Sequence, residues 1–246
     1  MMDHLIYKNF EGAPSRVIPE IISQGYYPYS TKQLLEKRLE VYNSSANNSE
    51  KNFWLETPFV TGDICIYHKD RRMKILTDAS EIRSVLLDLK GMINPDGSMK
   101  IYGKLFEDLK GREFTRYDDK KYATRQSLEH KDIITNPYWV TLVDGDKALL
   151  SEYAQIIIDS SKKKRSERVM GVIALDALKP EFDLRLCKLH GIYTTQQGLA
   201  YESDIEMQQK ISSEKTNILA YKIEIAKQES NQTKRTKNSK IISMRI

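Results

Sequence analysis

Two short apolar runs separated by a polar turn place the strongest constraint on what this chain can fold into. Residues 63–67, DICIY, and 73–76, MKIL, stand on either side of the turn-like segment HKDRR. Short apolar runs joined by a polar turn are typical of a β-hairpin. Residues 81–90 then carry apolar side chains at positions i, i+3, i+4 and i+7, which predicts an amphipathic helix directly after the hairpin.

Helical and strand patterns continue on both sides of this unit. Ser30 and Gln33 have capping-box spacing, so a helix is expected to begin at Ser30. The polar segment 43–52, NSSANNSEKN, predicts a loop, and residues 53–60 are rich in aromatic and β-branched residues, which predicts a strand. Ser203 and Glu206 have the spacing of a further helix cap.

Residues 138–175 have the pattern of a β-α-β unit. The run YWVTLV at 138–143 and the run VMGVIAL at 169–175 are predicted strands, and a segment with one apolar helix face lies between them. Residues 184–189 predict another strand. The fold class expected from these patterns is α/β, with mixed α+β as the alternative, built on one central mixed sheet flanked by helices.

The 246 residues are enough to bury a sizeable core. We expect a single α/β domain over residues 1–228, with a possible subdivision near 43–52, followed by a basic tail over 229–246. No stretch has the length of apolar sequence that a membrane span needs, and the first ten residues, MMDHLIYKNF, lack the pattern of a signal peptide. With only two cysteines, a cytoplasmic protein without a membrane partner is expected.

Basic residues gather in two places. The formal net charge is +5, and the segment after Ala226 alone accounts for it. The candidate phosphate-binding residues are Lys162, Lys163, Lys164, Arg165, Arg168, Lys234, Arg235 and Lys237. Clustered basic charge suits the phosphate backbone of nucleic acid, with DNA as the expected partner, because binding releases counterions. The alternative is a solvated loop and a frayed tail.

Two acidic residues stand at strand ends in the predicted hairpin unit. Asp63 begins one strand, and Asp78 follows the next in the string Asp78-Ala79-Ser80. This order of elements and acidic residues resembles the PD-(D/E)xK nuclease superfamily, with Gly62 where a Pro is usual and Ser80 where a Lys is usual. The resemblance implies that Asp63 and Asp78 hold Mg²⁺ and that Ser80 takes the place of the water-positioning residue. The alternative is that Asp78 caps the following helix and that Asp63 is a turn residue.

A second acidic string, Asp144-Gly145-Asp146, follows the predicted strand 138–143, and Asp176 follows the strand 169–175. The string resembles the Toprim pattern of primases and topoisomerases, in which paired Asp residues hold Mg²⁺. Asp144, Asp146 and Asp176 are therefore alternative magnesium ligands. The competing interpretation is a turn at Asp144-Gly145 with Asp146 as the cap of the next helix.

Both cysteines are followed by a histidine three residues later. The two pairs are Cys65 with His68 and Cys187 with His190, and four such ligands satisfy tetrahedral Zn²⁺ in a structural site. The alternative is that the cysteines are small apolar core residues, because residues i and i+3 of a regular strand point to opposite faces.

Three functions remain open on these observations. The first is a Mg²⁺-dependent, restriction-type endonuclease that cleaves DNA phosphodiesters, with a homodimer as a possible assembly. The second is a non-catalytic nucleic-acid-binding or assembly protein that uses the same basic residues. The third is an unrelated intracellular enzyme or interaction protein with an incidental basic tail.

Overall fold

The computed structural model of the chain describes residues 4–68, 70, 72–77, 79–89, 93–94, 98–101, 103–123, 129–164, 170–173, 183–189, 205–206 and 216–224. The described helices are α1 (Pro14–Ser23), α2 (Thr31–Asn43), α3 (Asn48–Glu56), α4 (Ala79–Leu89), α5 (Gly103–Asp108), α6 (Arg116–Tyr122), α7 (His130–Ile133), α8 (Pro137–Leu142) and α9 (Lys147–Lys164). The described strands are β1 (His4–Gly12), β2 (Tyr27–Pro28), β3 (Phe59–Tyr67), β4 (Met73–Leu76), β5 (Met99–Lys100), β6 (Arg112–Phe114), β7 (Val172–Ile173), β8 (Asp183–Leu189), β9 (Ile205–Glu206) and β10 (Thr216–Glu224).

The described strands form one mixed sheet with the order β1-β10-β3-β8-β9-β7. β4 extends the sheet from β3 toward β6. The first and last described strands pair with each other in antiparallel register, from His4 opposite Glu224 to Gly12 opposite Thr216. β10 then runs parallel to β3. The predicted fold class, helices around one mixed sheet, is confirmed.

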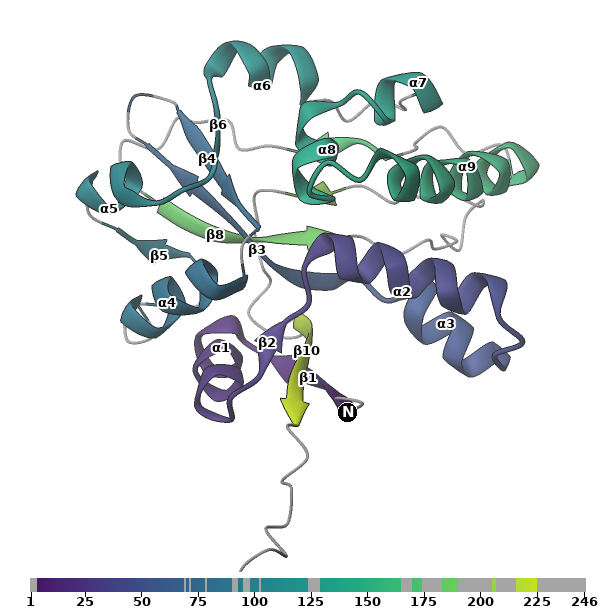
Figure 1. Ribbon diagram of the computed structural model, residues 1–246, viewed down its shortest axis with the longest axis horizontal. Coiled ribbons are helices and arrows are strands. Elements are labelled where there is room, and N and C mark those ends of the chain that lie inside the picture. Colours follow the sequence, from purple (N-terminus) through teal and green to yellow (C-terminus); the bar gives the residue numbers. More distant parts are fainter. Residues whose placement is uncertain are drawn as a thin grey trace, which may run out of the picture.

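Helices cover both faces of the sheet, so its central strands are buried on both sides. In β3, Ile64 and Ile66 belong to an apolar cluster with α1 and α4, whereas Cys65 and Tyr67 belong to a cluster with α2, α8 and α9. Figure 1 shows α2, α3 and α9 to one side of β3, and α1 and α4 to the other. Because successive side chains of a strand point to opposite faces, β3 contributes residues to both apolar clusters.

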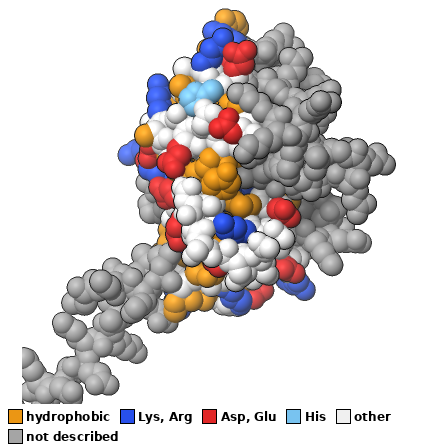
Figure 2. All heavy atoms as spheres, turned by 90° about the vertical axis from the view of Figure 1, so that its right-hand side faces the viewer, with side chains coloured by type: hydrophobic (Ala, Val, Ile, Leu, Met, Phe, Trp, Pro, Cys, Tyr) orange, Lys and Arg blue, Asp and Glu red, His pale blue; other side chains and the backbone are white. Residues whose placement is uncertain are grey.

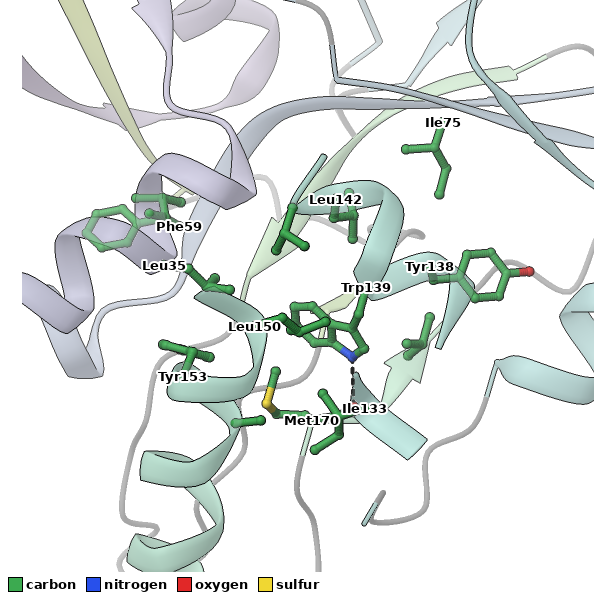
Figure 3. Packing of buried hydrophobic residues seen from close by; sticks show 14 of the residues in the cluster. Leu35, Phe59, Ile75, Ile133, Tyr138, Trp139, Leu142, Leu150, Tyr153 and Met170 are labelled. Carbon is green, nitrogen blue, oxygen red and sulfur yellow. Dashed lines mark hydrogen bonds between the residues drawn. The ribbon is translucent and has the colours of Figure 1, made fainter. Parts of the chain in front are cut away.

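The core on the α9 side is centred on Trp139, which is fully buried. Its indole Nε1 donates a hydrogen bond of 2.9 Å to the backbone oxygen of Met170 (Figure 3), and Leu142 and Leu150 belong to the same apolar cluster. This contact ties α8 to the segment that leads into β7, because a buried indole N–H needs an acceptor.

Several predicted elements are confirmed. α2 begins after Ser30, and both hydrogen bonds of the capping box with Gln33 are present. β3 and β4 form the predicted antiparallel hairpin. α4 covers the predicted helix up to Leu89. The strand predicted at 184–189 lies within β8.

Two predictions on the second half of the chain are wrong. Residues 138–143 belong to α8 and its C-terminal cap rather than to a strand, because the Asn136 side chain accepts hydrogen bonds from the N–H groups of Tyr138 and Trp139. The predicted β-α-β unit is therefore absent from residues 138–164. Ile205 and Glu206 form β9, which contradicts the helix expected after Ser203.

The predicted loop at 43–52 and the strand at 53–60 are also partly wrong. Asn47 caps α3 by accepting a hydrogen bond of 3.0 Å from the N–H of Glu50, and the helix continues through Glu56. Only Phe59 and Val60 of the predicted strand lie in β3. Asparagine favours turns and N-caps alike, so its clustering here marks a helix start as well as a loop.

Candidate ligand pocket

Asp63, the first predicted magnesium ligand, lies in a bulge of β3 and caps a helix. The register between β3 and β8 shifts between Val60 and Ile64. The Asp63 Oδ2 accepts a hydrogen bond of 2.7 Å from the backbone N–H of Thr31, the first residue of α2. The neighbouring N–H of Gly62 donates to the backbone oxygen of Tyr29 at 2.7 Å. The bulge therefore holds the start of α2 against the centre of the sheet.

The side chain of Asp63 is fully buried. Burial raises its pKa from the ordinary value of 3.8 to about 6, against the opposing effect of hydrogen bonds from Thr31 and Thr61. A carboxylate that binds a catalytic metal must face a space that can hold the ion and the scissile phosphate. The place of Asp63 thus supports a structural role in fixing α2 and gives the metal-ligand hypothesis no support.

The other two residues of the predicted nuclease site are Asp78 and Ser80. Asp78 lies outside the described residues, and Ser80 stands in the first turn of α4. Among the residues that the structure describes, no group of three or more His, Cys, Asp or Glu side chains is placed to hold a metal ion. The magnesium site at Asp63 and Asp78 stays a prediction.

The alternative acidic string forms a turn between two helices. Asp144 and Gly145 adopt positive φ angles of 54° and 77°. Asp146 Oδ1 accepts a hydrogen bond of 3.0 Å from the N–H of Leu149, so Asp146 caps α9. Its Oδ2 also lies 3.9 Å from the Lys32 ammonium. Asp176, the third residue of this predicted site, lies outside the described residues.

The two Cys-x-x-His pairs start from neighbouring strands that run in opposite directions. Cys65 is buried in β3 and is the register partner of Arg185 in β8, the strand that contains Cys187. β3 runs toward Tyr67 and His68, while β8 runs toward Leu189, the partner of Phe59 at the other end of β3. His190 lies outside the described residues. This arrangement gives a shared zinc site no support.

Most of the predicted phosphate-binding residues fall outside the described part of the chain. Lys162, Lys163 and Lys164 end α9, whereas Arg165, Arg168, Lys234, Arg235 and Lys237 are not described. On the face shown in Figure 2, acidic and basic side chains of the described residues are interspersed. The nucleic-acid interface therefore stays a prediction.

A cavity of about 390 Å³ lies between the start of α2, the strands β2 and β3, and α4. The described residues around it come from the end of α1, from β2, from the first two turns of α2 and from the β3 bulge, and also from the residue after β4, from α4, from the end of α8 and from the turn before α9. Gly62 of the bulge lines the cavity, and a Cβ atom there would come within 2.9 Å of the Pro28 carbonyl oxygen. Glycine thus lets β2 and β3 approach closely at this point.

The cavity combines an apolar wall with charged side chains. Ile22, Ile82, Leu86 and Leu142 are buried and line it. Lys32 and Arg83 line it as partly buried cations, and Glu36 and Asp144 line it as exposed acids. A concave, mainly apolar site with a few polar groups is typical of small-molecule binding.

Sequence reasoning identifies only part of this pocket. Asp144 and Gly62 stand out in the sequence for other roles, and Ser30 and Gln33 stand out as a helix cap. Arg83, which lies next to a buried residue of the predicted helix stripe, carries no signal of its own. An arginine on the edge of an apolar helix face is an ordinary solvent-facing residue until the neighbouring elements are known.

Among the described residues, no helix is both long enough and apolar enough to cross a lipid bilayer. No protein-family model matches the chain, and no curated protein matches it. The chain is similar to a solved structure reported as "Accommodation of massive sequence variation in Nanoarchaeota by the C-type lectin fold". The TM-score is 0.54 at 10% sequence identity, and the match covers 91% of this chain and 98% of the other. This likeness shows a shared C-type lectin fold.

Proposed function

We propose that this chain is a non-catalytic binding protein and that the pocket beside α2 holds its ligand. The observation that carries the proposal is the pocket itself, a cavity of about 390 Å³ with an apolar wall and a partly buried arginine. The described residues around it include neither cysteine nor histidine, and its two acidic residues are exposed. Such a lining supports retention of a ligand more than nucleophilic or general-base chemistry.

The fold is compatible with this proposal without specifying a ligand. In the similar structure from Nanoarchaeota, the C-type lectin fold is described as accommodating massive sequence variation. A fold that accepts such variation provides a frame for different surfaces, so the ligand must be sought in the side chains of this chain.

The endonuclease and nucleic-acid-binding hypotheses stay beside this proposal as predictions. Both depend on residues that the structure does not describe, namely Asp78 and most of the basic residues. The burial of Asp63 favours the binding protein over the nuclease.

The proposal is tested by thermal unfolding of the full chain against a panel of small organic molecules. A ligand that binds only the folded state raises the midpoint of unfolding. We expect some compounds to raise the midpoint of the native chain but not that of Thr77→Phe, whose ring would occupy the pocket beside Thr77. Leu87→Phe on the exposed side of α4 is the matched control and should respond as the native chain does.

A panel in which no compound distinguishes the native chain from Thr77→Phe would contradict the proposal. Plasmid DNA cleavage that requires Mg²⁺ and is lost in Asp63→Asn would replace it with the nuclease. A shift of DNA mobility that weakens steeply with salt would favour the nucleic-acid-binding protein.

A further inference from the structure

Arg83 is the best-positioned charged group in the pocket. Its guanidinium carbon lies 4.5 Å from the centre of the Tyr27 ring. The Tyr27 ring also stacks with Tyr221 of β10, with 5.6 Å between ring centres and 26° between planes. Tyr27 is thus held by the sheet, and its ring in turn supports the guanidinium. This contact already restricts the Arg83 side chain, so less conformational entropy is lost when Arg83 binds a ligand.

Within the part of the chain that the structure describes, the N–H donors of the Arg83 guanidinium have no acceptor. Among the described residues, the contact with Tyr27 is the only interaction of its side chain, and no carboxylate lies within ion-pair distance. A cation–π contact uses the face of the guanidinium and leaves its N–H groups free in the plane. A planar fork of N–H donors matches a carboxylate in two parallel hydrogen bonds.

The charged side chains of the pocket differ in exposure. The two cations, Lys32 and Arg83, are partly buried, whereas the acids Glu36 and Asp144 are exposed. Charges act more strongly where water is partly excluded, so the two partly buried cations favour an anionic group in the pocket. The exposed acids oppose the approach of a group with two negative charges, which favours a carboxylate over a phosphate.

The apolar side chains of the pocket favour a ligand with an apolar body. Ile82 and Leu86 lie near Arg83 on α4 and are buried, and Ile22 and Leu142 continue the apolar wall. An apolar body that displaces water from this wall gains free energy in proportion to the area it covers.

From these observations we propose that the pocket binds an apolar monocarboxylate, with Arg83 as the residue that recognises the carboxylate. This inference rests on the proposed binding function and names the ligand class for the same site. Lys32 of α2 contributes a second positive charge, and its ammonium lies 3.9 Å from Asp146.

The test is calorimetric titration of the full chain with 3-phenylpropanoate, with 3-phenylpropanamide as the uncharged analogue and phenyl phosphate as the dianion. We expect 3-phenylpropanoate to bind at least about tenfold more tightly than the amide, because the amide loses the charge-assisted hydrogen bonds. Arg83→Met should weaken binding of the carboxylate by about tenfold or more and leave binding of the amide nearly unchanged.

Arg112→Met is the matched control, since Arg112 also lies over an aromatic ring, at 5.5 Å from Phe114, but does not line the pocket. It should bind 3-phenylpropanoate as the native chain does. Equal affinity for the carboxylate and the amide, tighter binding of phenyl phosphate, or an Arg83→Met variant with native affinity would overturn the inference. If the compound panel yields a ligand that Thr77→Phe excludes while 3-phenylpropanoate fails to bind, the inference fails and the binding function stands.

Discussion

Single polar residues fix the start of α2 more than the apolar pattern does. Ser30 caps the helix through its own side chain, as the spacing to Gln33 predicts. Asp63 adds a second cap from 32 residues away, because its carboxylate accepts the N–H of Thr31. The local cap is visible in the sequence, whereas the distant one is not, because it depends on a β-bulge that brings Asp63 next to α2. The sequence therefore marks Asp63 as an acidic residue without revealing its partner.

The buried Asp63 predicts a specific dependence of stability on pH. Its pKa in the folded chain is about 6, above the ordinary value of 3.8. The folded state therefore holds the proton more tightly, and the contribution of Asp63 to the free energy of unfolding is full below about pH 4 and is lost as the pH rises through about 6. Asp63→Asn keeps an acceptor for Thr31 and cannot ionise.

We expect the free energy of unfolding of the native chain, relative to that of Asp63→Asn, to fall by about 3 kcal/mol between pH 4 and pH 8. Urea unfolding of both proteins across this range measures the difference. A difference that does not change with pH would show that the carboxylate is not desolvated.

Whole elements are predictable where the spacing of apolar residues is distinctive and poorly predictable where residue type is the main signal. The helix α4 and the hairpin of β3 and β4 follow directly from their apolar spacing. The six-residue helix α8 resembles a strand in sequence because YWVTLV is rich in β-formers. The available signal is Asn136-Pro137, an N-cap followed by proline at the first helical position. Once the helix starts, Tyr138, Trp139 and Leu142 are buried.

The Arg38 side chain links three helices, α2, α3 and α9. It is fully buried in α2, and its guanidinium donates hydrogen bonds of 3.0 Å to the backbone oxygens of Trp54 and Thr57 and to the hydroxyl of Tyr153 in α9. Arg38→Met retains much of the apolar contact but removes the donors. Because a buried carbonyl without a donor costs about 1–3 kcal/mol, we expect a loss of about 3 kcal/mol or more in the free energy of unfolding.

Lys37→Met in the same helix is the control for this substitution. Lys37 pairs with Glu40 at the surface, and such exposed pairs contribute between about 0 and 1 kcal/mol. Equal effects of the two substitutions in urea unfolding would argue that Arg38 does not join the helices.

The architecture of the whole molecule depends on pairings that no local pattern contains. β1 and β10 lie at opposite ends of the described chain and form nine register pairs. The other edge of β10 pairs with β3. The predicted strands indicate one mixed sheet but not which strand borders which, because apolar alternation defines a face and not a neighbour. The pocket follows from this arrangement, since its walls come from elements spread between α1 and the turn before α9.

Because β3 contributes side chains to both apolar clusters, the two faces of the sheet should unfold together. Both tryptophans of the chain, Trp54 and Trp139, lie in the cluster on the α9 side, so their fluorescence reports that side alone. Ile64 is fully buried in the other cluster. Ile64→Ala removes packing there and should lower the free energy of unfolding by about 2–5 kcal/mol.

If the two clusters form one cooperative unit, the tryptophan fluorescence of Ile64→Ala will shift to the same lower urea midpoint as its far-ultraviolet circular dichroism. Leu87→Ala, at an exposed position of α4, should change the free energy of unfolding seen by either signal by no more than about 0.5 kcal/mol. A fluorescence midpoint that stays at the native value while the dichroism midpoint falls would mean that the two faces unfold separately. In that case β3 would join two independent cores, and the pocket, whose walls include Ile82 and Leu86 of one cluster and Leu142 of the other, would lose its shape before the α9 side unfolds.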